Sequence, residues 1–316
     1  MRRAVTGFGF AEALIVGGGS RRLERIADLI AWEPFERLLA PVYAASTGRP
    51  AYPPLSMLKV LLLQQWYGLS DPAMEEALGD RLSFRRFADV PLDAAVPDHS
   101  TISRFRSELV RLGLAELVFT EATRQLAVKG LIVKTGTLID ATLVAAAAAE
   151  PPKQKGGGRS QADPDATWVK QGHKATFGYK LHVAVDQGSL IVRAAHLTAA
   201  NVNEITLGPA LVQGDERAVW ADKGYVGPTM RAKLKAHGIK DRVQRRNSKS
   251  RRLTSREIKR NIMIARVRSR IEGVFGTLKR SYGLARMRYM GLARNAAASL
   301  VLLTAWNLAR AADKIT

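Results

Sequence analysis

The sequence predicts an α/β protein of two domains: a helical domain over residues 1–130, then a mixed five-stranded sheet with helices on both faces over residues 131–316. Up to about Gly130 the apolar residues recur at three- and four-residue steps, which is the period of helices. After it, short runs rich in β-branched residues alternate with helical segments. With 316 residues, 47% of them hydrophobic, the chain is long enough to bury two such cores.

Composition limits the possible sites and surroundings. The chain has no cysteine, which excludes a disulfide framework and any thiolate-bound zinc or iron–sulfur cluster, and which suits a reducing cytoplasm. The apolar N-terminus contains Glu12 and lacks a clear cleavage site, so we do not expect a signal peptide. The apolar run 296–306 suits a core helix and is too short to cross a membrane.

Positive charge is concentrated in one part of the chain. The formal net charge is +21, and residues 228–290 contain 20 Lys and Arg against 3 acidic residues, a net of +17. Such a density points to a polyanionic partner, and nucleic acid is the one we expect. A solvated basic face is the other interpretation, and a membrane surface is disfavoured because the block lacks an apolar insertion face.

Three helices are predicted in the later part of the helical domain. The apolar run 57–67 and residues 72–78 form two of them, and Pro97 with Asp98 begins the third. In the third helix the apolar side chains form one stripe and leave the polar ones outward, namely Ser100, Ser103, Arg104, Ser107 and Arg111. That layout is typical of the recognition helix of a helix-turn-helix, although an ordinary surface helix of a bundle has it too.

The first predicted strand contains an acid. Residues 136–144 are rich in β-branched side chains, and Asp140 lies in the middle of them. Burying a charge without a partner costs several kcal/mol, so a carboxylate in such a strand indicates a functional site. The polar, Gly- and Pro-containing residues that follow predict a mobile loop at about 150–174.

Four further elements lead to a second acid. Strands are predicted over 178–186 and 189–197, a short helix over 203–212, and another strand that begins at Ala218 and ends in Asp222. A carboxylate at the carboxyl end of a strand, followed by a glycine turn, is where α/β folds place reacting groups.

A third acid lies on an amphipathic helix over residues 266–279, after a helix, a fifth strand and a basic linker. Glu272 is the only acid of this segment; Arg268 precedes it by four residues and Lys279 follows it by seven, near one line of a single helix. A carboxylate between two cations can bind a divalent metal while the cations hold a phosphodiester. A surface ion pair is the alternative interpretation.

The order of these elements is that of an RNase H-like fold, an α/β/α arrangement in which the first and fourth strands lie side by side. Asp140 and Asp222 can then meet over the helix that carries Glu272. Three carboxylates without histidine or cysteine suit Mg²⁺ or Mn²⁺. Two such ions activate the attacking oxygen and stabilise the leaving oxygen in a displacement at phosphorus. We expect His182 and His196, in predicted strands, to be core residues rather than ligands.

Several motifs together resemble the DDE transposases of bacterial insertion sequences, specifically the insertion-sequence-five family. PPLSMLKVLLLQQWYGLSD with PDHSTISRFR resembles the family's helical N-terminal domain, IDATLV its first-acid block, FGYKLHVAVD its hairpin, ADKGY its second-acid block and RIEGVFGTLKRSYG its third. The C-terminal signature of the family is tyrosine, two residues, arginine, three residues, glutamate, six residues and lysine. Arg268, Glu272 and Lys279 fit it, whereas Ala265 stands at the tyrosine position.

The resemblance implies an enzyme that binds terminal inverted repeats, hydrolyses a DNA strand at each end and transfers the 3′-hydroxyl into target DNA. It implies Asp140, Asp222 and Glu272 as catalytic ligands of two Mg²⁺ or Mn²⁺ ions, and at least a homodimer in the complex with DNA. For DNA contacts we expect Arg268, Lys279, Arg280, Lys223, Tyr225, Ser100, Ser103, Arg104, Arg245, Arg246, Arg251 and Arg252. An RNase H-like nuclease without strand transfer and a DNA-binding regulator are the alternatives.

Overall fold

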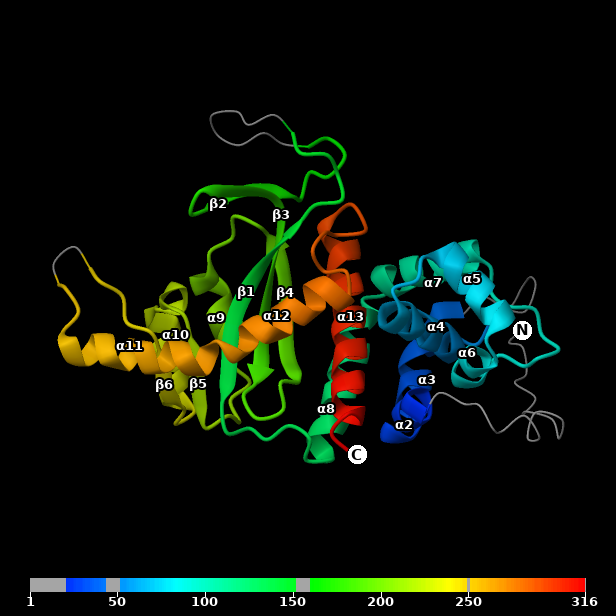
Figure 1. Cartoon of the computed structure of the whole chain (residues 1–316), viewed down its shortest axis with the longest axis horizontal. Helices are drawn as coiled ribbons and strands as arrows, with labels where there is room; N and C mark the ends of the chain where they lie inside the picture. The colour runs from blue at the N-terminus through cyan, green and yellow to red at the C-terminus, as the bar shows by residue number, and fades with distance from the viewer. Residues whose placement is uncertain (1–20, 44–51, 152–159, 249–250, 316) are drawn as a thin grey trace. The chain divides into compact units, whose positions relative to one another are not determined.

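The computed structural model describes residues 21–43, 52–151, 160–248 and 251–315 (Figure 1). Its contacts divide the chain into two compact units. The first ends at Val128 and also includes residues 297–316, and the second is Lys129–Ala296. The sequence-based division placed the C-terminal residues with the second domain instead. Their helix contributes to the core of the first unit, where the indole nitrogen of Trp66 donates a hydrogen bond to the Ala305 carbonyl at 2.8 Å.

The first unit is helical, as its apolar periodicity predicts. Its helices are α2 (Arg21–Leu29), α3 (Glu33–Leu39), the 3₁₀ helix η1 (Ala40–Tyr43), α4 (Pro54–Tyr67), α5 (Asp71–Asp80), α6 (Leu82–Phe87), α7 (His99–Arg111), α8 (Leu114–Val128) and most of α13 (Leu292–Ala312). Helix α4 is buried on nearly all sides, which makes it the centre of this unit. No helix among the described residues is long and apolar enough to cross a membrane.

Helix α7 has the face that its sequence predicts. Asp98 caps it by accepting a hydrogen bond from the Thr101 backbone nitrogen at 2.6 Å. Ile102, Phe105 and Leu109 are buried against the unit, and the opposite side is exposed.

The second unit is built on a mixed sheet of six strands. They are β1 (Thr137–Ala145), β2 (Thr167–Gln171), β3 (Lys174–Asp186), β4 (Val192–Ala199), β5 (Ala218–Ala221) and β6 (Lys240–Val243), in the order β2-β3-β1-β5-β6, with β4 also paired to β3. We predicted that the first and fourth strands lie side by side. The structure confirms this: they are β1 and β5, which pair in parallel.

The sheet has one strand more than the five that the sequence predicts, and the reason is β2. Residues 167–171 pair antiparallel with the start of β3 instead of belonging to a loop. The Trp168 ring packs on Phe177 of β3 with 5.5 Å between ring centroids, which gives this short hairpin an apolar contact of its own.

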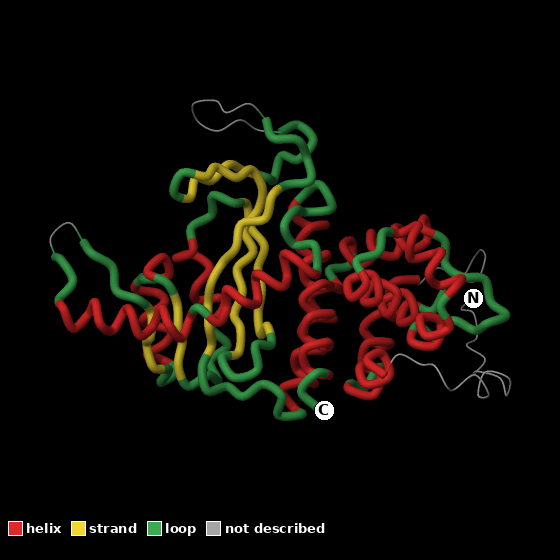
Figure 2. Tube along the Cα trace, in the orientation of Figure 1, coloured by secondary structure: helices red, strands yellow, loops and turns green. Residues whose placement is uncertain are grey.

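Helices cover both faces of the sheet (Figure 2). Helices α9 (Glu204–Leu211) and α10 (Pro228–Ala236) share a core with Ile139 of β1 and Val219 of β5. Helices α11 (Ser255–Arg268) and α12 (Arg270–Ser281) pack on the other face, against β5 and β1. Because successive side chains of a strand point to opposite faces, Asp140 lies on the α12 side while Ile139 faces α9 and α10.

The helix expected over residues 266–279 is two helices, with Ser269 between them. The Ser269 hydroxyl donates to the Arg266 carbonyl at 2.8 Å, and the Glu272 backbone nitrogen bonds three residues back to the Ser269 carbonyl at 3.1 Å. Such side-chain and three-residue bonds tighten the turn and redirect the helix axis. Arg268 and Glu272 therefore belong to different helices, whereas we expected one.

Candidate active site

Asp140 lies in the middle of β1 and has the most hydrogen-bond partners of the three predicted acids. Its side chain is 19% exposed, and that of Arg268, the last residue of α11, is 16% exposed. An Arg268 Nη1 hydrogen donates to one carboxylate oxygen of Asp140, and the Ala141 backbone nitrogen donates to the other at 3.0 Å. The buried acid thus has the partner that its position in an apolar strand requires.

The electrostatic surroundings of Asp140 bring the other two acids into the site. Burial raises the pKa of Asp140 to about 6, the Arg268 guanidinium opposes this shift, and the charges of Asp222 and Glu272 add to it. The three predicted acids therefore act on one another although they come from distant parts of the chain. The Asp140 carboxyl is ionised at neutral pH, but is more easily protonated than an exposed aspartate.

Asp222 comes directly after β5 and caps the 3₁₀ turn η2 (Lys223–Tyr225). Its Oδ1 accepts a hydrogen bond from the Gly224 backbone nitrogen at 2.6 Å. Ile139 and Ala221 are register partners in the parallel pair of β1 and β5, so Asp140 and Asp222 are the next residues on adjacent strands. With Ile139 and Ala221 both in the core under α9 and α10, the alternation directs the two acids to the other face.

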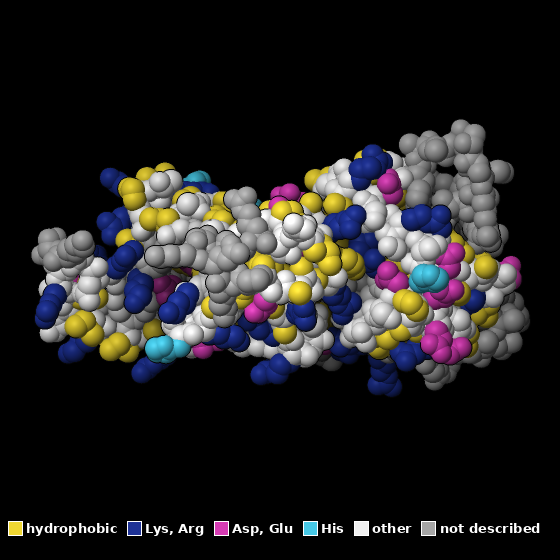
Figure 3. Space-filling view, turned by 90° about the horizontal axis from the view of Figure 1, so that it is seen from above, with side chains coloured by type: hydrophobic (Ala, Val, Ile, Leu, Met, Phe, Trp, Pro, Cys, Tyr) yellow, Lys and Arg dark blue, Asp and Glu magenta, His cyan; other side chains and the backbone are white. Residues whose placement is uncertain are grey.

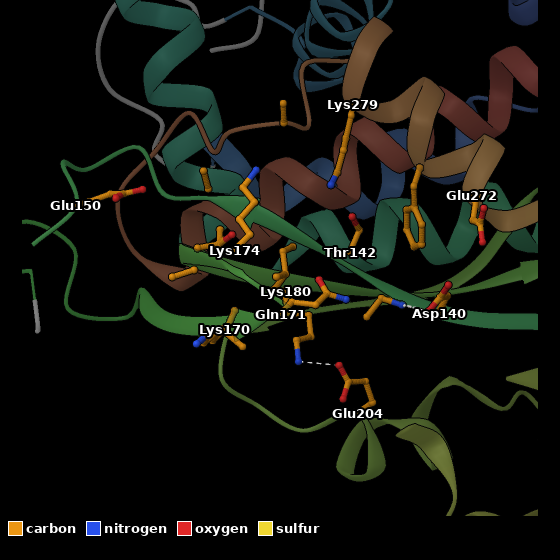
Figure 4. Close-up of a pocket in the computed structure, with 18 residues that line it drawn as sticks. Asp140, Thr142, Glu150, Lys170, Gln171, Lys174, Lys180, Glu204, Glu272 and Lys279 are labelled. Carbon is orange, nitrogen blue, oxygen red and sulfur yellow. Dashed lines mark hydrogen bonds and ion pairs between the residues drawn. The ribbon is translucent and has the colours of Figure 1, made fainter. Parts of the chain in front are cut away.

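Glu272 is in the first turn of α12 and is exposed. The buried residues Ile271, Val274, Phe275 and Leu278 hold α12 on the sheet. Figure 4 shows Glu272 and Asp140 at the same end of a cavity of about 890 Å³, with Lys279 of α12 further along it. Asp222 is not among the residues that line this cavity.

The donor chemistry of these acids fits a divalent cation, because carboxylate oxygens are the ligands that Mg²⁺ and Mn²⁺ prefer. Their arrangement holds the oxygens apart: among the described residues, no three acidic or histidine side chains converge closely enough to hold an ion. The guanidinium of Arg268 supplies the positive charge at Asp140 in this arrangement.

Tyr225 and Lys223, which lie close to Asp222 in the sequence, differ in their exposure to solvent. The Tyr225 side chain is 1% exposed, so the prediction that it contacts DNA is wrong for this structure. Burial raises the pKa of Tyr225, and the charges of Asp140, Glu204 and Asp222 raise it further. Its hydroxyl has no hydrogen-bond partner among the described residues, which places an unused donor beside the acids. Lys223 is exposed.

Sequence reasoning missed Glu204, another acid that lines the cavity. Its Oε1 accepts a hydrogen bond from Lys180 Nζ at 2.7 Å (Figure 4), and Asn203 caps its helix, α9. In the sequence, Glu204 looks like an ordinary acidic residue in the first turn of a helix. The available signal was Lys180, which is only 7% exposed: a lysine inside an apolar strand requires an acidic partner elsewhere in the chain.

The basic residues after β6 differ in whether an acid pairs with them. Arg245 and Arg251 both pair with Glu257 of α11, at 3.4 and 2.9 Å, which holds the linker on that helix. Arg246, Arg252 and, on α12, Arg280 are exposed. Figure 3 shows Lys and Arg side chains on the end of the second unit that carries α10 and α11, and others along the rest of this face.

The predicted recognition residues of α7 are on its exposed side. Ser100, Ser103 and Arg104 are exposed, Ser100 Oγ donates to Asp98 at 2.7 Å, and Arg104 donates to Thr101 Oγ1 at 3.0 Å. Arg106 pairs with Asp71 at 2.6 Å and ties α7 to α5. Their contact with DNA stays a prediction.

Two comparisons with protein families match most of the chain. Residues 132–308 match a family described as a transposase DDE domain. Residues 16–108 match a family described as a transposase domain. No solved structure matches the chain.

Proposed function

This chain belongs to the DDE transposases, an enzyme family that acts on DNA, and we propose that it moves an insertion sequence. It binds the terminal inverted repeats, hydrolyses one strand at each end, and transfers the resulting 3′-hydroxyl into target DNA. The motif resemblance described above supports its place in the insertion-sequence-five family. Cutting two ends requires at least a homodimer in the complex with DNA.

The observation that carries this proposal is the register between β1 and β5. It supports Asp140 and Asp222 as neighbours on one face of the sheet, beneath α12, which carries Glu272 in its first turn. These three residues would hold two Mg²⁺ or Mn²⁺ ions, which supply Lewis acidity to the attacking and leaving oxygens when bound.

The chain's own residues have three further roles in the proposal. Arg268 holds the Asp140 carboxylate in the absence of DNA and offers its guanidinium to a phosphate of bound DNA. Lys279, along the cavity from Glu272, holds a second phosphate of the cut strand. Tyr225 closes the site from beneath, because its buried ring keeps water from the core side of Asp140 and Asp222.

The helical unit and the basic linker provide the binding energy in this proposal. Ser100, Ser103 and Arg104 of α7 read base edges of the repeat, in the manner of a recognition helix. The exposed arginines of the linker, Arg246 and Arg252, together with Lys223 and Arg280, contact phosphates without regard to sequence.

Incubation of the protein with labelled ends of its own element, a target plasmid and Mg²⁺ tests the proposal. We expect nicked ends with 3′-hydroxyls, then joined products, with Asp222→Asn as the inactive control. Cutting without joining, in Mg²⁺ and in Mn²⁺, would instead identify a nuclease without strand transfer. Binding without cutting would identify a DNA-binding regulator.

A further inference from the structure

We propose that the cavity between α12 and the β2–β3 hairpin is a channel for one DNA strand, in which Lys174 and Lys279 bind phosphates from opposite walls. The channel leads away from the acids of the active site, so this inference rests on the proposed function and specifies where the strand next to the cut phosphate lies.

The floor of the channel is β1. Asp140, Thr142 and Ala145 all line the cavity, which therefore follows the strand over the five residue steps from Asp140 to Ala145. At about 3.3 Å per residue this is roughly 17 Å. Phosphates of one strand follow one another every 3.4 Å along a duplex axis, so the floor is as long as about five stacked nucleotides.

The two walls come from different elements. Lys170, Gln171 and Lys174 belong to the β2–β3 hairpin, and Glu272, Phe275 and Lys279 to α12. In Figure 4 the acids Asp140 and Glu272 are at one end of the cavity, and Lys174 and Lys279 lie further from that end, on either side of it. A strand that enters past the lysines thus reaches the acids.

These lysines differ from their neighbour Lys180 in whether an acid pairs with them. Lys180 pairs with Glu204 at 2.7 Å, whereas no ion pair joins Lys170, Lys174 or Lys279 to an acid among the described residues. Burial lowers the pKa of the half-buried Lys279, and the positive charge of Lys174 lowers it further. Lys174 is exposed, so water screens part of the repulsion between the two ammonium groups, and an anion bound between them would relieve the rest.

The size of the cavity distinguishes one strand from a duplex. Its volume of about 890 Å³ is within the range of roughly 300 to 1,000 Å³ typical of pockets that enclose small molecules. A few nucleotides of single strand fit such a space, and we expect a double helix to be too wide to enter it. We therefore expect the channel to bind a single-stranded extension and to leave blunt duplex ends unaffected.

Fluorescence anisotropy without divalent metal tests this channel. The probes are a labelled short duplex with a single-stranded extension of about five thymidines and the same duplex with blunt ends. We expect Lys174→Ala and Lys279→Ala each to weaken binding of the extended probe about tenfold, and to reduce its log–log salt slope by about 0.7 for each phosphate that the variant no longer binds. Binding of the blunt probe should change less than twofold.

Lys129→Ala is the matched control, because it removes one exposed lysine of the same unit that does not line the cavity. Equal losses in Lys129→Ala and Lys174→Ala, or equal losses on both probes, would overturn the channel. If the wild-type protein joins ends and Lys174→Ala binds the extended probe normally, the channel alone is wrong. If the wild-type protein never cuts, the proposed function is wrong whatever the probes show.

Discussion

Arg268, at the end of α11, holds the carboxylate of Asp140 on β1, a residue 128 positions earlier in the chain. Both side chains are less than one-fifth exposed, so each supplies the charge that the other needs. A divalent cation at Asp140 and a phosphate at Arg268 would replace this pair. The charges of the two side chains are thus compensated before a metal ion or a phosphate binds.

The first prediction concerns this ion pair. Arg268→Ala leaves Asp140 without its guanidinium, so we expect the second unit to lose about 3 kcal/mol of stability in EDTA. Mg²⁺ should restore part of this loss because it takes the place of the guanidinium. Thermal melting with and without Mg²⁺ measures both effects, and Arg268→Lys, which keeps a cation, is the control. A Mg²⁺ shift no larger than that of the wild-type protein would contradict this view of the site.

The second prediction concerns the three acids. Asp140→Asn, Asp222→Asn and Glu272→Gln each remove ligand charge without emptying the core, so each should reduce strand cleavage by orders of magnitude. Affinity for the element's ends should stay within a few fold, as measured by gel shift. Any of the three variants that cuts at the normal rate excludes its residue from the site.

The third prediction separates two kinds of DNA contact. Arg246→Ala and Arg252→Ala remove exposed cations that no ion pair holds among the described residues, so the fold should be unaffected. Each should weaken binding to all sequences and reduce the log–log salt slope by about 0.9 for each duplex phosphate that the variant no longer binds.

Ser103→Ala and Arg104→Ala on α7 should instead reduce the preference for the terminal repeat over unrelated DNA. Competition binding with specific and random duplexes measures that preference. A uniform loss of affinity in both pairs of variants would show that α7 is not a recognition helix.

The fourth prediction concerns the joining step. Strand transfer requires the cut end to stay bound until target DNA arrives, and Lys279 is placed along the cavity from Glu272. Lys279→Ala should therefore slow the joining of pre-cut ends at least as much as first-strand cleavage. Single-turnover assays on cut and uncut substrates compare the two steps, with Lys129→Ala as the control. A larger effect on cleavage than on joining would argue against a role in end retention.

The fifth prediction concerns pH and the buried His182 of β3. Burial lowers the pKa of His182 to about 4 from 6.5, and the charge of Lys180 adds to the shift. The unfolded chain therefore binds a proton that the folded chain does not, and stability falls as the pH falls between about 6.5 and about 4. A shift of this size corresponds to roughly 3 kcal/mol.

His182→Asn should remove most of that dependence, since it has no titratable ring. The difference between melting midpoints at about pH 5 and about pH 7.5 measures it. The exposed His173→Asn is the control and should keep the wild-type difference. An unchanged difference in His182→Asn would mean that the buried ring is protonated in the folded protein.

The strands that carry or precede the first two acids, and the positions of those acids, were predictable from short stretches of sequence. Each acid is part of a local pattern: one is a charged residue inside a β-branched run, and the other stands at a strand end before a glycine. Such patterns can be recognised without knowing how distant parts of the chain pack. Helix α7 was predictable for the same reason, because its buried stripe and its capping Asp98 lie within a few residues of one another.

Other features were not predictable because they depend on contacts between distant residues. Strand β2 is polar enough to read as a loop, and becomes a strand only because β3 continues past the end of β4 and offers it an edge. The burial of Tyr225 follows from α9 and α10 covering its turn. The importance of Glu204 follows from Lys180, 24 residues away, which needs its charge.

The sequence by itself therefore determined the two kinds of domain, the positions of β1, β5 and α7, and the three acids. The tertiary structure alone decided that Arg268 pairs with Asp140, that Ser269 separates it from the helix of Glu272, and that Lys174 faces Lys279. The physical reason is the distance along the chain over which each kind of interaction acts. Periodicity, capping and turn formation act over a few neighbouring residues, whereas the partner of a buried charge is selected by whichever element the packing of the sheet brings against it.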